Sequence, residues 1–179
     1  MNNEQITNIN ERKEKIEEIL KRAEHGLEIS TQNNWLLDSG LDHLAIGKAL
    51  FGKAVLNPPD FKFIADLSLH HLNTSIEGLR KAGSSDYIPR GLLARAAFYR
   101  HYGEYQKALE DLDEVLEIAE SGGMKLYLTD YYLEMGRLHL AQNQLGEARE
   151  HCTEAKKLIE ETGYKRRERE LEELIKNVN

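Results

Sequence analysis

The sequence predicts an all-α protein, an α-solenoid of antiparallel helical hairpins with a right-handed superhelix and a C-terminal capping helix. Composition is the first reason: the 179 residues include 26 Leu and 23 Glu but only 3 Val and 6 Thr, whereas strands favour β-branched residues. The second reason is an internal repeat of 40 residues, and the third is the helical spacing of the apolar residues. The length is that of a single domain, which we place over residues 1–179.

The repeat appears when the sequence is shifted by 40 residues against itself. The shift aligns Leu72 with Leu112 and Cys152, Ser75 with Val115 and Ala155, and Gly83 with Gly123 and Gly163. The aligned glycines predict that three helices end in the same way, because glycine is the usual residue after a helix C-terminus. Gly103 and Asn143 predict tight turns inside the units, so each repeat reads as a helical hairpin.

Residues 4–53 are predicted to form an irregular pair of helices before the repeats. Apolar residues at helical spacing mark residues 4–29 as a long first helix, and a second helix follows it. Pro58-Pro59 cannot continue a helix, so residues 52–60 predict a loop, with Asp60 as the N-cap of the next helix.

Two repeats, residues 61–122 and 125–162, and a capping helix, residues 165–177, complete the predicted domain. The helices expected there are 61–81, 86–102, 105–121, 125–141, 145–162 and 165–177. The last helix has a basic side and an apolar side, as expected of an end-piece that covers the final hairpin. Its basic run could also indicate a nucleic-acid or lipid contact, but charge runs at the ends of solenoids usually serve solubility.

Charge and hydropathy narrow the class of protein further. A formal net charge of −7 and a pI near 5.6 argue against nucleic-acid binding as a general function, since phosphate contacts need a basic surface. No stretch approaches eighteen consecutive apolar residues, and residues 1–15 carry no apolar run for a secretory signal. The single cysteine, Cys152, cannot form an internal disulfide, so we expect a cytoplasmic protein.

The hairpins resemble the tetratricopeptide repeat over about residues 40–162. The resemblance lies in the pattern Leu92-x-x-Arg95-Ala96-x-x-Tyr99-x-x-x-Gly103-x-Tyr105-x-x-Ala108, and a second unit follows it 40 residues later. Arg95 departs from the family pattern, and the period is 40 residues instead of 34. A longer-period subclass, similar to the C-terminal helical repeats of bacterial signalling ATPases of the STAND type, fits this period better.

This resemblance implies a non-enzymatic scaffold that binds a partner peptide or domain. The alternative it implies is the sensor or regulatory arm of a larger bacterial signal-transduction ATPase or peptide-responsive regulator. The residues themselves offer no catalytic site: the run Gly47–Ala54 is close to a phosphate-binding loop but follows no predicted strand. No two histidines lie four residues apart, so we expect no metal and no cofactor, and Cys152 reads as a small buried hydrophobe.

A partner would bind on the concave side of the predicted superhelix, which the first helix of each hairpin lines. The candidate partner-binding residues are Lys48, Phe51, Arg90, Leu93, Arg100, His101, Asp130, Leu133, Glu134 and Arg137. Apolar anchors mixed with Arg and Lys suit a peptide that carries acidic groups. The equally weighted alternative is that these are ordinary surface residues, or that they pack on another domain.

The first helix presents an apolar stripe without a preceding hairpin to cover it. If this helix packs only on the next one, one side of Ile9, Ile16 and Leu20 stays open. Such a stripe tends to pair with another chain or domain, so we predict a homo-oligomer or an adjoining domain at this helix.

Overall fold

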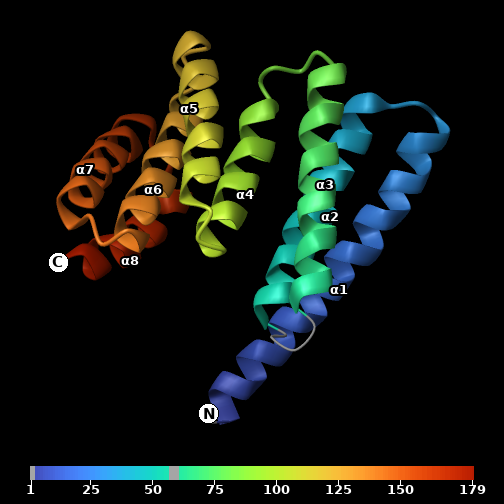
Figure 1. Cartoon of the computed structure of the whole chain (residues 1–179), viewed down its shortest axis with the longest axis horizontal. Coiled ribbons are helices and arrows are strands. Elements are labelled where there is room, and N and C mark those ends of the chain that lie inside the picture. The colour runs from blue at the N-terminus through green and yellow to red at the C-terminus, as the bar shows by residue number, and fades with distance from the viewer. Residues whose placement is uncertain (1–2, 57–60) are drawn as a thin grey trace. The chain divides into compact units, whose positions relative to one another are not determined.

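A computed structural model describes residues 3–56 and 61–179. All secondary structure in these two ranges is helical, and Figure 1 shows the helices following one another along the chain. They are α1 (Asn3–Gln32), α2 (Leu36–Leu56), α3 (Phe61–Lys81), α4 (Ile88–His101), α5 (Tyr105–Ser121), α6 (Lys125–Ala141), α7 (Leu145–Thr162) and α8 (Glu168–Val178), with a short 3-10 helix, Lys165–Arg167, before α8. The predicted all-α helical-repeat fold is confirmed.

The chain divides into two compact units, Met1–Ser85 and Asp86–Asn179. Unit 1 holds α1, α2 and α3, and unit 2 holds α4 to α8. The prediction of a single domain over residues 1–179, with two repeats and a capping helix, is not tested by this division into units and stays a prediction.

The helix ends that the repeat predicted lie at residues with positive φ. The angles are 68° at Gly83, 77° at Gly103, 61° at Gly123, 60° at Asn143 and 68° at Gly163. A side chain at such an angle costs roughly 1 kcal/mol or more, which glycine avoids and asparagine tolerates best. The predicted stops and the two tight turns inside the hairpins are therefore confirmed.

In unit 1, α2 packs on both α1 and α3. The approach of α2 to α3 is close at Gly47, where a Cβ atom would lie 2.9 Å from the Leu72 side chain and 3.1 Å from its backbone nitrogen. The hydroxyl of Ser68 donates a hydrogen bond to the Gly47 carbonyl at 2.8 Å. Gly47 therefore serves helix packing, and the segment that resembles a phosphate loop is the interior of a helix.

Two expectations about unit 1 need correction. The loop predicted from residue 52 starts too early, because α2 continues to Leu56; Pro58-Pro59 and the predicted cap Asp60 lie outside the described residues. Leu20 was expected to keep an open side, yet it is buried in a cluster with Ile46 and Leu50 of α2. Among the described residues, the large apolar side chains of this helix that stay exposed are Ile19, at 47%, and Ile29, at 39%.

In unit 2, α4 pairs with α5 and α6 pairs with α7. Small residues stand at these contacts, since Ala96, Ala108 and Ala148 are fully buried and a Cβ atom on Gly136 would lie 3.5 Å from the Ala148 carbonyl. A larger side chain would push the paired helices apart.

Arg95, the departure from the family pattern, joins α4 to α5. Its Nε and Nη2 donate to the two carboxylate oxygens of Asp111 at 2.9 and 2.6 Å. Asp111 is almost completely buried, and this paired geometry is the one in which a buried carboxylate is best compensated.

Candidate functional site

Three helices of unit 2, α4, α6 and α8, form the side of that unit on which the sequence placed most of the candidate binding residues. We call this side the first-helix face. α6 contacts α4 on one side and α8 on the other. A shallow cleft of about 260 Å³ opens on the face, and its lining comes from these three helices alone.

α8 occupies the place that the first helix of a further hairpin would take. The buried residues of α8 align with buried residues of α6 when the sequence is shifted by 40 residues. Leu171, Leu174 and Val178 of α8 correspond in this way to Tyr131, Glu134 and Leu138 of α6. The apolar side of α8 completes a core cluster with Leu133 of α6 and Cys152 of α7. Arg149 of α7 also donates a hydrogen bond to the carbonyl of Val178 at 3.0 Å, which satisfies one carbonyl at the end of α8.

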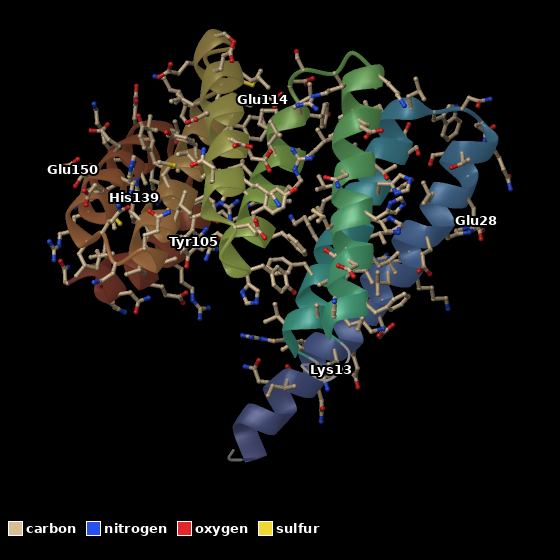
Figure 2. All side chains as sticks on the ribbon, in the orientation of Figure 1. Lys13, Glu28, Tyr105, Glu114, His139 and Glu150 are labelled. Atoms are coloured by element: carbon tan, nitrogen blue, oxygen red, sulfur yellow. The ribbon has the colours of Figure 1, made fainter. Side chains whose placement is uncertain are left out.

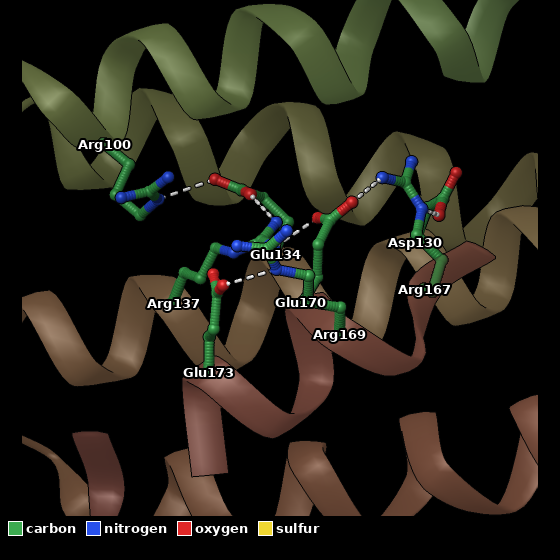
Figure 3. Close-up of polar contacts among 8 residues, drawn as sticks. All are labelled: Arg100, Asp130, Glu134, Arg137, Arg167, Arg169, Glu170 and Glu173. Carbon is green, nitrogen blue, oxygen red and sulfur yellow. Dashed lines mark hydrogen bonds and ion pairs between the residues drawn. The ribbon is translucent and has the colours of Figure 1, made fainter. Parts of the chain in front are cut away.

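A chain of ion pairs runs across the face and links the three helices (Figure 3). It starts at Arg100 of α4, whose Nε donates to Oε1 of Glu134 on α6 at 2.6 Å. The other oxygen of Glu134 accepts from Nη1 of Arg137, one helical turn further along α6, at 3.2 Å. Glu134 is only 5% exposed, so its charge is compensated by these two guanidinium groups and not by water.

The second half of the chain of ion pairs joins α6 to α8. Nη2 of Arg137 donates to Glu170 at 2.6 Å, and Nε of Arg167 donates to Asp130 at 2.7 Å. Arg167 also pairs with Glu170, which therefore receives two guanidinium groups. α8 is thus held on α6 by apolar contacts and by charge.

The electrostatics of these residues follow from their partners. Burial alone would lower the pKa of Arg167, but hydrogen bonds to Asp130 and Glu170 raise it above its ordinary value. Burial alone would raise the pKa of Glu170, but the hydrogen bonds from Arg137 and Arg167 lower it. Both groups are therefore charged at neutral pH.

The charged side chains of the first-helix face are neutralised by one another. Arg100, Arg137 and Arg167 meet the carboxylates of Asp130, Glu134 and Glu170. The sequence-based expectation treated Arg100 and Arg137 as charges offered to an acidic peptide. In the structure they already have carboxylate partners, so the cleft they line is mixed in charge.

The structure corrects the exposure expected of two candidate residues. Leu133 is 1% exposed because it packs in the cluster that α8 completes, and Glu134 is buried between Arg100 and Arg137. α8 covers Leu133, and the guanidinium groups of Arg100 and Arg137 cover Glu134, so neither side chain is open to a partner. Asp130 of α6 is half-buried under Arg167, which lies in the 3-10 helix directly before α8.

The other candidate residues lie in three places. Arg100 and Arg137 line the cleft. On α4, Arg90 and His101 are exposed and Leu93 is half-buried. The remaining two belong to unit 1, where Lys48 is exposed and Phe51 half-buried on α2.

Arg167 and Glu170 are the residues of this face that the sequence reasoning missed. The basic run before α8 was interpreted as a solvated side, although Arg167 turns out to be half-buried between two carboxylates. The signal was the repeat itself, because one more shift of 40 residues aligns Glu170 with Asp130 and the apolar residues of α8 with buried positions of α6. This alignment predicts that α8 packs beside α6 on the first-helix face.

Within the described parts of the chain, no group of three or more His, Cys, Asp or Glu residues is arranged to hold a metal ion. Cys152 is buried, and burial raises the pKa of its thiol, so the reactive thiolate is disfavoured. The same described residues contain no helix that is both long enough and apolar enough to cross a bilayer.

Comparison with known proteins gives one family. The model of the family described as 26S proteasome subunit RPN7 matches residues 60–172, which is more than half of the chain and reaches from the start of α3 into α8. The match supports a helical-repeat protein and does not single out the tetratricopeptide repeat or the repeats of signalling ATPases. No curated protein and no solved structure matches the chain.

Proposed function

The chain belongs to the family of the 26S proteasome subunit RPN7, and we propose that it is a non-enzymatic scaffold that binds a protein partner on the first-helix face of unit 2. The family's description names a subunit of a multi-protein assembly, and a helical-repeat fold offers an extended surface for such contacts. We also retain the expectation that the protein works in the cytoplasm.

The observation that carries the proposal is the difference between α4 and α6. On α6, Leu133 and Glu134 are buried and Asp130 lies under Arg167, whereas α4 keeps Arg90 exposed and Leu93 half-buried at the positions equivalent to Asp130 and Leu133. A partner would pack against α4 and reach the cleft beside Arg100. Because the cleft is mixed in charge, we expect a partner segment that carries both acidic and basic residues around an apolar anchor.

Lys48 and Phe51 lie on α2 of unit 1, outside the first-helix face, and their expected part in partner binding needs a test of its own. The alternative function, a sensor arm of a larger signalling ATPase, has no separate observation in its favour.

Site-specific photo-crosslinking in cells tests the proposal. The photoreactive residue p-benzoylphenylalanine replaces Arg90 or Leu93 on α4, and as controls it replaces Glu117 or Glu120, which are exposed on α5. We expect a discrete crosslinked protein from the α4 positions and none from the α5 positions. Crosslinks of equal yield from both helices, or none from α4, would contradict the proposal.

Arg100 and Arg137 are poor probes of binding, although the sequence singled them out for that purpose. Their ion pairs hold α4, α6 and α8 together, so their replacement would lower stability together with any affinity. A loss of binding would then have two explanations, which the exposed positions on α4 avoid.

A further inference from the structure

Unit 1 contains a groove between α1 and α3 with α2 as its floor. Its volume is about 500 Å³, and Leu27 of α1, Ile46 and Leu50 of α2, and Leu67 of α3 give it a largely apolar lining. Hydrophobic grooves on protein surfaces are a recurring docking site for the apolar face of an amphipathic helix. None of these residues belongs to the first-helix face, so the groove is a separate surface.

The apolar surface continues from the groove onto the outside of α3. Leu67 is 36% exposed, and Phe63, one helical turn before it, is 75% exposed. Residues four apart lie on the same side of a helix, so the two side chains form a short apolar ridge beside the groove. Exposed aromatic and aliphatic side chains that continue an apolar groove indicate a contact surface.

The α1 side of the groove is acidic. Glu24 and Glu28 line it one helical turn apart, and Figure 2 shows Glu28 on α1. Oε2 of Glu28 lies 3.7 Å from Nδ1 of His25, and both side chains are about three-quarters exposed, so this contact compensates the carboxylate only weakly. Glu24 has no ion pair among the described residues.

The α3 side of the groove brings no compensating positive charge. Its titratable residue is His71, whose Nδ1 lies 2.9 Å from Nδ1 of His43 on α2. Burial, together with the neighbouring His43 and His70, lowers the pKa of His71 to about 4, so this ring is neutral at pH 7. The groove is therefore apolar at its base and negative along one side.

We propose that this groove binds an amphipathic helix of a partner protein, with apolar side chains toward α2 and Lys or Arg side chains toward Glu24 and Glu28. A helix laid in a groove presents anchors at positions i, i+3 or i+4, and i+7. Basic residues beside those anchors complement the two carboxylates. The surface is additional to the one proposed above and does not depend on it.

In unit 2, the chain already binds one of its own helices, α8, by apolar contacts together with ion pairs at the edge. α8 places Leu171, Leu174 and Val178 in an apolar cluster, and its charged residues pair with α6 at the edge. The proposed ligand uses the same combination with the charges reversed, because here the protein supplies the carboxylates.

A pair of labelled synthetic peptides tests the proposal with the full chain. The first is a fourteen-residue helix with Leu at positions i, i+3, i+4 and i+7 and Lys elsewhere, and the second has Glu in place of Lys. Fluorescence anisotropy measures the Kd of each peptide. The variants are Glu24→Lys/Glu28→Lys in the groove and Glu117→Lys/Glu120→Lys on α5, which change the net charge equally.

We expect the Lys peptide to bind the wild-type chain and the Glu peptide to bind far more weakly. The groove reversal should weaken the Lys peptide by about tenfold or more, and the α5 reversal by about twofold or less, because only the former removes contacts at short range. Phe63→Glu should also weaken binding, and its side chain is exposed enough that the substitution cannot disturb the core. Far-UV circular dichroism confirms that each variant is folded.

Three results would overturn the proposal. They are no binding of the Lys peptide to the wild-type chain, equal weakening by the two charge reversals, and unchanged binding to Phe63→Glu. The second result would mean that the acidic protein attracts a basic peptide without a specific groove.

Discussion

Glu134 is the residue on which the charge network of unit 2 depends most, and its replacement by glutamine is the most informative single change. Its carboxylate is nearly buried and accepts from Arg100 and Arg137 at 2.6 and 3.2 Å. Glutamine has the same size and keeps one oxygen acceptor, so the change removes charge without leaving a cavity. Two guanidinium groups then lose their common counter-charge.

The magnitude follows from how far each partner reaches water. A hydrogen bond to a charged group contributes about 1.5 to 3 kcal/mol, and breaking a fully buried ion pair costs about 3 to 5 kcal/mol. The side chains of Arg100 and Arg137 are 24% and 28% exposed, and Arg137 keeps Glu170, so both retain some solvation. We therefore expect Glu134→Gln to lower the unfolding free energy of unit 2 by about 2 kcal/mol.

Urea denaturation followed by circular dichroism measures this loss. The matched control is Glu173→Gln on α8, because its partner Arg169 is almost fully exposed and such pairs contribute little. The control should stay within about 0.5 kcal/mol of the wild type. The double variant Arg100→Met/Glu134→Gln should lower the free energy of unfolding by less than the sum of the two single variants, since the two residues interact. A Glu134→Gln variant as stable as the control would refute the reasoning about the network.

Three further predictions concern unit 1. The pKa of His71 is lowered from 6.5 to about 4 in the folded chain. As the pH falls, the His71 ring therefore becomes protonated in the unfolded chain before it does in the folded chain. The free energy of unfolding should then be highest above about pH 6.5 and should decrease between about pH 6.5 and about pH 4. Because the ring is partly exposed, the loss should be about 1 to 2 kcal/mol, and His71→Gln should abolish it in urea titrations at several pH values. Gly47→Ala should destabilise the unit by about 1 to 3 kcal/mol in the same assay, since the new Cβ atom meets Leu72, including its backbone nitrogen; an unchanged midpoint would show that α3 can move away. Self-association through α1 stays a prediction: light scattering at micromolar concentration should give a dimer or larger for the wild type and a monomer for Ile19→Glu, because Ile19 is exposed whereas Ile16 packs partly against α2. A monomeric wild type would reject it.

The hairpins could be predicted from sequence because each one leaves local marks. A residue that must adopt positive φ is nearly always glycine or asparagine, so Gly103 and Asn143 stand at the turns inside the hairpins. A close approach of two helices needs small side chains, so Ala96 and Ala148 stand at the contacts. Such constraints act on single positions and recur with the repeat.

The candidate site was harder to predict because its properties depend on pairs of distant residues. Glu134 looks like a surface residue in sequence, but it is buried because Arg100, 34 residues earlier, and Arg137 both pair with its carboxylate. Leu133 looks like an open anchor until α8 folds back over it. Periodicity identifies which side of a helix is apolar, but it does not identify which segment covers that side.

Hydrogen exchange tests most directly whether a protein partner binds the first-helix face of unit 2. The exchange of the full chain should be measured alone and with the partner identified by crosslinking. We expect slower exchange in α4, residues 88–101, when the partner is bound, and unchanged exchange in α5, residues 105–121. Slower exchange confined to α5 and α7, with α4 unchanged, would contradict this expectation.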